Sequence, residues 1–141
     1  MKLLLVSHGN FCHGIKESYE MIAGKNDNII SISLGDDGIG VFSEKLRSKL
    51  TELIENDEVL VLSDIQGGTP YNEAYRFKLE NPDKVEILTG MNLPMLIECG
   101  TSLDIGSSIE ELVNIGLNVG KDSIVKCEID DSDDDDDDLE F

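Results

Sequence analysis

Four short apolar runs in this sequence, each followed by a stretch of helical periodicity, restrict the fold more than any other feature. Each run is rich in Leu, Val and Ile with little polar alternation, which is typical of parallel strands covered on both faces. Strands that alternate with amphipathic helices indicate a doubly wound sheet. We therefore expect an α/β fold with a mainly parallel four-stranded sheet and helices on both faces. The expected strands are Lys2–Val6, Ile29–Ser33, Glu58–Ser63 and Val85–Thr89.

Five stretches have apolar residues at helical spacing, and two of them carry clear start signals. Thr69 and Pro70 predict a helix start, with Thr69 as the N-cap and Pro70 in the first helical position. Ser108 to Glu111 forms a capping box before the last helix, and Gly120 is expected to end that helix. The helical patterns begin at Phe11, Phe42, Thr69, Asn92 and Ile109.

The segment Ser123–Glu128 differs from the four apolar runs because its residues alternate between apolar and polar. Such alternation is typical of a half-exposed strand at the edge of a sheet. An exposed edge strand is an aggregation hazard unless it pairs with something. We therefore expect this segment to be an edge strand that is exchanged with a partner subunit.

The net charge of −19 over 141 residues argues against nucleic acid as a partner, because phosphates would be repelled. Nine of the negative charges lie between Asp130 and Glu140, which leaves −10 for the rest. We expect one domain over residues 1–129 and a disordered acidic tail over 130–141. Three cysteines without a paired framework, and no signal-peptide or bilayer-spanning pattern, predict a cytoplasmic protein.

Three polar segments follow strand ends and should meet at one rim of the sheet. They are Ser7–Gly9, Ser63–Pro70 and Thr89–Pro94, and they converge if the first and third strands are neighbours, as in the flavodoxin-like order. Asp64 could then accept a hydrogen bond from one ring nitrogen of His8, which would fix the tautomer of the imidazole. The turn before the third helix could hold an anion through the backbone N–H groups of Gly67, Gly68 and Thr69 and the Thr69 hydroxyl. These groups together suit phosphoryl transfer.

Each group also has a simpler interpretation. A strand-end histidine is more often structural than catalytic, Asp64 could cap a turn, and the glycines could serve backbone conformation alone. A metal site using His8, Cys12, His13 and Asp64 is a minority interpretation, because zinc-like spacing is absent. The P-loop spacing and the G-x-S-x-G elbow are absent as well, which argues against autonomous ATP use and against a serine hydrolase.

Three motifs taken together resemble a known family. They are the opening Leu4-Leu5-Val6-Ser7-His8-Gly9, the turn Asp64-x-x-Gly67-Gly68-Thr69-Pro70, and Gly90-Met91-Asn92-Leu93-Pro94-Met95-Leu96. In this order and at these strand ends, they are similar to the enzyme IIA domain of the mannose-type phosphoenolpyruvate-dependent sugar phosphotransferase system (PTS). The resemblance covers Met1 to about Ile129.

The resemblance implies that His8 accepts a phosphoryl group from the carrier HPr and passes it to a histidine of enzyme IIB, and so serves membrane sugar permease components indirectly. It implies that Asp64 bonds the ring nitrogen that does not react, that no metal or cofactor is needed, and that the protein is a homodimer with an exchanged C-terminal strand. His13 is expected to have no essential role. Similar domains serve several sugars, so the resemblance does not select one.

Three alternatives stay open on the sequence alone. The first is the phosphoryl-donor subunit of a dihydroxyacetone kinase, which the Gly67–Pro70 turn disfavours. The second is a regulatory module that acts through partners. The third, from a different class, is a small metal-dependent hydrolase that uses His8 and Asp64 with Cys12 and His13.

Overall fold

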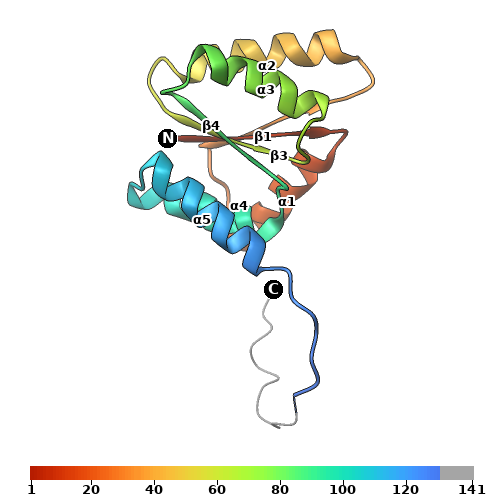
Figure 1. Cartoon of the computed structure of the whole chain (residues 1–141), viewed down its shortest axis with the longest axis vertical. Coiled ribbons are helices and arrows are strands. Elements are labelled where there is room, and N and C mark those ends of the chain that lie inside the picture. The colour runs from red at the N-terminus through yellow and green to blue at the C-terminus, as the bar shows by residue number, and fades with distance from the viewer. Residues whose placement is uncertain (131–141) are drawn as a thin grey trace.

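The computed structural model describes residues 1–130 and has a four-stranded parallel sheet between two layers of helices (Figure 1). The predicted α/β fold is confirmed, and every strand pair in the described chain is parallel. The strands are β1 (Lys2–His8), β2 (Ile29–Leu34), β3 (Val59–Ser63) and β4 (Val85–Thr89). The helices are α1 (Phe11–Ala23), α2 (Ile39–Leu53), α3 (Thr69–Glu80), α4 (Leu93–Ser102) and α5 (Ile109–Asp122), with a short 3₁₀ turn η1 (Leu103–Ile105).

The strand order is β2-β1-β3-β4. The first and third strands are therefore neighbours, which is the condition under which the loops after them meet at one rim of the sheet. The register pairs Val6 with Ser63, which brings the ends of β1 and β3 side by side. The chain order reverses direction between β1 and β3, and ligands of such sheets bind at this point beyond the carboxyl ends of the strands. The topology therefore places the β1–α1 and β3–α3 loops together.

The buried strands contribute side chains to two hydrophobic cores, one on each face of the sheet, because successive side chains point to opposite faces. Leu3 and Leu5 belong to the core under α1, α4 and α5, whereas Leu4 and Val6 belong to the core under α2 and α3. All four side chains are fully buried. This two-sided burial explains why the strands read as continuous apolar runs rather than as alternating patterns.

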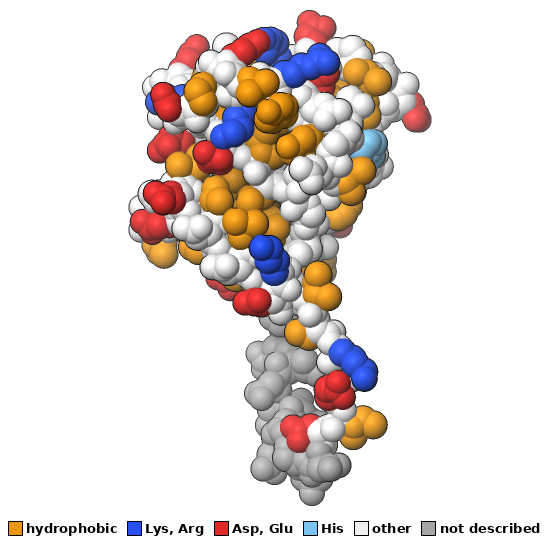
Figure 2. All heavy atoms as spheres, viewed as in Figure 1, with side chains coloured by type: hydrophobic (Ala, Val, Ile, Leu, Met, Phe, Trp, Pro, Cys, Tyr) orange, Lys and Arg blue, Asp and Glu red, His pale blue; other side chains and the backbone are white. Residues whose placement is uncertain are grey.

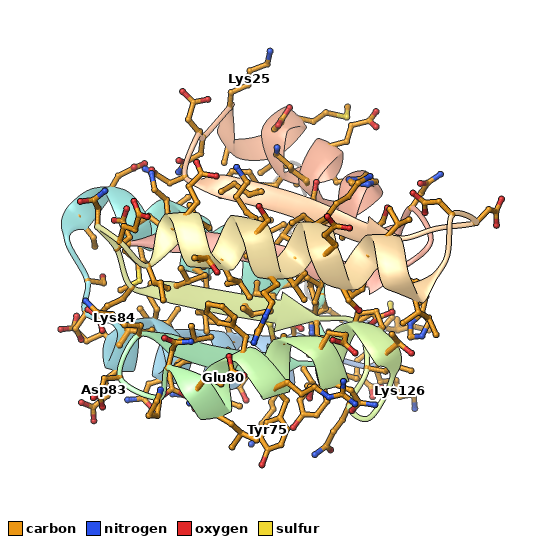
Figure 3. The ribbon with its side chains drawn as sticks, turned by 90° about the horizontal axis from the view of Figure 1, so that it is seen from above. Lys25, Tyr75, Glu80, Asp83, Lys84 and Lys126 are labelled. Carbon is orange, nitrogen blue, oxygen red and sulfur yellow. The ribbon has the colours of Figure 1, made fainter. Side chains whose placement is uncertain are left out.

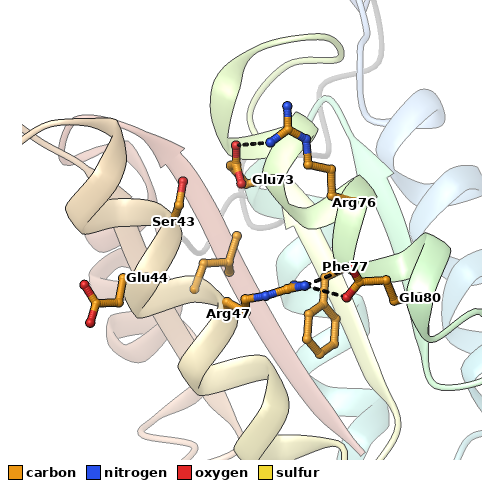
Figure 4. Close-up of a pocket in the computed structure, with 8 residues that line it drawn as sticks. Ser43, Glu44, Arg47, Glu73, Arg76, Phe77 and Glu80 are labelled. Carbon is orange, nitrogen blue, oxygen red and sulfur yellow. Dashed lines mark hydrogen bonds and ion pairs between the residues drawn. The ribbon is translucent and has the colours of Figure 1, made fainter.

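Helices α2 and α3 are held together at their outer surface by Arg47. Its guanidinium donates two hydrogen bonds to the Glu80 carboxylate, at 2.8 and 2.6 Å, and lies over the Phe77 ring (Figure 4). Figure 4 shows the Glu80 side chain turned toward Arg47 of α2. These residues line a hollow of about 350 Å³ that contains none of the predicted site residues.

Two local predictions were wrong. Gly120 does not end the last helix, since α5 continues to Asp122; a side chain at Gly120 would collide with Met95, so close helix packing explains this glycine. Gly68, not Thr69, is the N-cap of α3. The segment Ser123–Glu128 has no strand partner within residues 1–130, and its expected exchange with a partner subunit stays a prediction. The acidic tail predicted from residue 130 lies, from residue 131 onwards, outside the described residues.

Gly116 allows α5 to pack closely on α4 and β4, and this contact gives a stability prediction. A Cβ at Gly116 would lie 2.6 Å from Leu88 Cδ1 and 3.1 Å from Cys99 Sγ, both in the core. Gly116→Val should therefore lower the free energy of unfolding by about 2 kcal/mol through overpacking. Urea denaturation would measure it. Gly14→Val is the matched control, because Gly14 is also helical and has open space around it; equal effects of the two variants would contradict the packing argument.

Candidate functional site

His8 and Asp64 lie at the carboxyl ends of β1 and β3 and are joined by two hydrogen bonds. The His8 Nδ1 atom lies 2.7 Å from Asp64 Oδ2, and the His8 backbone N–H donates to the same oxygen at 2.9 Å. The other carboxylate oxygen accepts from the Ile65 N–H at 2.9 Å. The His8 side chain is 47% exposed and that of Asp64 is 13% exposed. The carboxylate is thus fixed in place, while about half of the His8 side chain faces solvent.

The environment of Asp64 keeps its carboxyl group ionised. Burial alone would raise the pKa of Asp64, but hydrogen bonds from the His8 N–H, the His8 imidazole and the Ile65 N–H outweigh it and hold the pKa below its ordinary value. An ionised carboxylate can only accept hydrogen bonds, so the His8 Nδ1 atom carries the proton. In neutral His8 the lone pair is therefore on Nε2, which points away from Asp64.

The turn that begins α3 lies against the exposed side of the imidazole. A Cβ at Gly68 would lie 2.6 Å from His8 Cε1 and 3.2 Å from His8 Nε2, so only glycine allows this close approach. Gly67 has a φ of +83°, a backbone conformation that disfavours other residues. Gly67 and Gly68 therefore serve different needs, one conformational and one steric.

The first turn of α3 offers free hydrogen-bond donors beside His8. Gly68 makes no side-chain cap, and none of the hydrogen bonds within residues 1–130 uses the backbone N–H of Gly68 or Thr69. Thr69 is the first residue of α3, and its hydroxyl is free of protein partners in this part of the chain. Unpaired N–H groups at a helix N-terminus attract anions.

Two residues that the sequence argument did not use hold these loops in place. The fully buried Ser7 hydroxyl donates to the Gly9 carbonyl at 3.1 Å and accepts from the Cys12 N–H at 2.8 Å, so it fixes the turn after His8. Asn72 donates from Nδ2 to the Gly67 carbonyl at 3.2 Å. A polar residue inside an apolar run, and an asparagine in the first turn of a helix after two glycines, are the signals that could have pointed to them.

The four residues of the metal hypothesis do not converge. The His13 ring bonds the Ser31 and Ser33 hydroxyls of β2, at 2.7 and 3.0 Å. Cys12 is fully buried in the core, where burial raises the pKa of its thiol. Within residues 1–130 no group of three or more His, Cys, Asp or Glu side chains is arranged to hold a metal ion. The arrangement therefore offers an imidazole with Nε2 unbonded within residues 1–130, an orienting carboxylate and free N–H donors.

A family model described as "PTS system fructose IIA component" (EIIA-man) matches residues 2–115 of this chain. The chain belongs to this family. Members of the family carry out phosphoryl transfer on histidine during sugar uptake, and membership implies HPr and enzyme IIB as partners. The family resemblance predicted from the three motifs is confirmed. Within residues 1–130 the helices are too short or too polar to span a bilayer.

Similar proteins agree with the family assignment. The fructose-specific EIIA component of Bacillus subtilis is 36% identical over 115 residues, which are 81% of this chain and 77% of that protein. The mannose-specific EIIAB component of Escherichia coli K12 is 28% identical over 123 residues, and the chain spans only 38% of its length. A crystal structure of an EIIA component from Streptococcus agalactiae has a TM-score of 0.80 at 31% identity, covering 89% of this chain and 95% of that one.

Proposed function

We propose that His8 is the residue of this EIIA domain that carries the phosphoryl group, with Nε2 as the reacting atom. The observation that carries the proposal is the 2.7 Å contact between His8 Nδ1 and Asp64. It holds the proton on Nδ1 and leaves the Nε2 lone pair free at an exposed edge of the sheet. Residues 1–129 form the domain that performs the transfer.

The transfer step needs no proton to leave His8 Nε2. The Nε2 lone pair forms a bond to phosphorus while the bond from phosphorus to the donor histidine nitrogen breaks, and that nitrogen keeps the electron pair. The His8 ring then bears a positive charge, because Nδ1 keeps its proton and Nε2 carries the phosphoryl group. Asp64 stabilises this charge, as a buried carboxylate does for an imidazolium that forms during a reaction. Transfer to enzyme IIB is the reverse of this step with another histidine.

The negative charge on the phosphoryl oxygens is balanced by the turn before α3. Within residues 1–130 the N–H groups of Gly68 and Thr69 and the Thr69 hydroxyl have no partner, Gly68 lies against His8, and Gly67 gives the turn its shape. Preorganised donors of this kind stabilise charge that develops in the transition state. Positioning and electrostatics account for most of the catalysis of phosphoryl transfer, which suits this set of groups.

Incubation of the protein with phosphoenolpyruvate, enzyme I and HPr tests the assignment. We expect an acid-labile phosphoryl group whose ³¹P resonance and proteolytic fragment identify Nε2-phosphohistidine at residue 8. Absence of label under conditions in which HPr itself is phosphorylated would remove the proposal, and label on Nδ1 would reverse the assigned role of Asp64.

We further propose that the protein is a homodimer in which the C-terminal segment of one copy pairs with the open edge of β4 in the other. In the described chain β4 pairs only with β3, so its outer edge is free. Hydrophobic side chains gather on this face, where β4 lies between α3 and α5 (Figures 1 and 2). Tyr75 and Leu117 are exposed there, on α3 and α5 respectively, and Figure 3 shows Tyr75 pointing outward.

The segment after α5 fits such an edge in composition. Residues 123–130 leave the body of the domain after α5 (Figure 1), with Ile124 83%, Val125 80% and Ile129 95% exposed. A segment with exposed apolar side chains is a natural strand for an open, apolar edge. Pairing would bury both surfaces and satisfy both sets of backbone groups.

Two truncations test the dimer by sedimentation equilibrium. The full chain should have twice the 15.5 kDa mass of one copy. A chain that ends at Asp130 should remain dimeric, whereas a chain that ends at Asp122 should be monomeric because the pairing segment is lost. A monomeric full chain, or a dimer that survives truncation at Asp122, would refute the exchange.

A further inference from the structure

The peptide unit between Gly67 and Gly68 can point in two directions, and its direction matters for the site. It joins two glycines, and no Cβ on either side restricts rotation of the unit. One orientation presents the Gly68 N–H to an anion beside His8, and the flipped orientation presents the Gly67 carbonyl oxygen. A carbonyl oxygen would repel phosphoryl oxygens, so a flip would turn a stabilising group into a destabilising one.

Asn72 contacts this peptide unit from the helix side. Its Nδ2 atom donates to the Gly67 carbonyl at 3.2 Å, and its backbone N–H donates at 2.8 Å to the Gly68 carbonyl, which belongs to the next peptide unit. In a trans peptide the C=O and N–H bonds point in opposite directions. A carboxamide that binds the Gly67 carbonyl therefore directs the Gly68 N–H away from α3, and that N–H has no partner within residues 1–130.

The flipped orientation has no comparable support. Gly68 lies against the His8 ring in both orientations, since a Cβ at this residue would be 3.2 Å from Nε2, so the direction of the peptide decides which group faces the site. A Gly67 carbonyl turned from Asn72 would lose its hydrogen bond, and the Asn72 carboxamide would lose its only bonded partner in the described chain. The Asn72 side chain is thus placed to select one of two backbone states.

We propose that Asn72 is a positioning residue for phosphoryl transfer, which holds the Gly67–Gly68 peptide in the orientation that presents an N–H to the phosphoryl group. This inference rests on the proposed role of His8. Asn72 acts through the peptide and takes no part in bond making. Its contribution is the fraction of molecules in the productive state, so its loss lowers the rate without changing the reaction.

Asn72→Ala tests the proposal, with Asn81→Ala as the matched control. Asn81 is on the opposite end of the same helix and also donates from its carboxamide to a backbone carbonyl, that of Phe77, at 3.1 Å. With phospho-HPr as donor, Asn72→Ala should lower kcat about tenfold and leave KM unchanged. That loss lies below the roughly hundredfold effect of removing a whole donor. Asn81→Ala should transfer at the wild-type rate.

Two further readouts separate positioning from docking and from folding. The tenfold deficit should persist with phosphoramidate, a small phosphoryl donor that makes no protein contacts. The Gly68 amide resonance should move strongly when His8 of the wild type is phosphorylated, and much less in Asn72→Ala. A deficit that vanishes with phosphoramidate, or a change in KM alone, would overturn the proposal. So would a Gly68 amide resonance that moves as far in Asn72→Ala as in the wild type when His8 is phosphorylated. Absence of His8 label in the wild type would instead overturn the proposed function.

Discussion

Replacement of His8 by alanine should abolish acid-labile phosphorylation while the protein stays folded. Acid-labile phosphate is a property of phosphohistidine, and a hydroxyl such as that of Thr69 would instead give an acid-stable ester. The His8 side chain is about half exposed and makes one side-chain hydrogen bond, so its removal should cost about 1 kcal/mol of stability. The His8 backbone N–H still bonds Asp64 in the variant, which preserves the contact between β1 and β3.

The measurement is phosphoryl incorporation from phospho-HPr into His8→Ala, with circular dichroism and thermal unfolding as checks on the fold. His13→Ala is the matched control, because His13 is the other histidine of the chain and bonds two serines on β2. We expect full labelling of His13→Ala. Label retained by His8→Ala, or lost from His13→Ala, would contradict the assignment of His8.

Asp64→Asn should slow phosphoryl transfer about a hundredfold, which is the usual order for losing one preorganised electrostatic partner. The amide keeps the shape of the carboxylate, but its single oxygen can accept from only one of the two backbone N–H groups, His8 or Ile65, that bond the two Asp64 oxygens. It has no negative charge to stabilise the ring as Nε2 takes up phosphorus, and its NH₂ group can stabilise the wrong His8 tautomer. Stopped-flow transfer from phospho-HPr would measure the loss, and an unchanged rate would refute the orienting role.

The same variant gives a prediction about stability and pH. The pKa of Asp64 is lower in the folded protein than in the unfolded chain, so its ionised form stabilises the fold. This contribution is fully present above the unfolded pKa of about 4 and is lost as the pH falls through the folded pKa. The wild type should therefore be more stable than Asp64→Asn near neutral pH, with the difference shrinking below about pH 4. A constant difference over this range would contradict the sign of the shift.

The sheet could be predicted from sequence because burial on both faces leaves continuous apolar runs. The end of β1 was less accessible to prediction. Ser7 and His8 are polar and read as a turn, yet they pair with Ser33 and Leu34 and belong to the strand. Tertiary hydrogen bonds, which residue type does not reveal, extend the strand to His8.

Errors at the helix ends have a common cause. Glycine is typical of a helix end, but Gly120 lies within α5. A glycine is needed there because Met95 occupies the space that a side chain would need. Threonine is typical of an N-cap, yet the N-cap of α3 is Gly68, in the glycine turn before Thr69. In both cases a neighbouring element decides the conformation, and local propensity is overridden.

The sequence predicts the reacting groups of the candidate site but not the residues that hold its loops in place. His8 and Asp64 could be paired from the strand order alone, because parallel strands bring their carboxyl ends to one rim. The hydroxyl of Ser7 and the carboxamide of Asn72 act on backbone carbonyls whose directions depend on the turns themselves. Such contacts follow from φ and ψ angles, which the sequence specifies only through its glycines.

The contact between His8 Nδ1 and Asp64 has a kinetic consequence for the whole relay. Under the proposed role of His8, a phosphoryl donor and a phosphoryl acceptor must both approach Nε2, because Nδ1 is bonded to Asp64, and they cannot do so together. Transfer through this domain is then a ping-pong process in which each partner competes with the other for the same atom. An excess of unphosphorylated donor would slow the flow as a product inhibitor, so throughput depends on how fast the two partners exchange places.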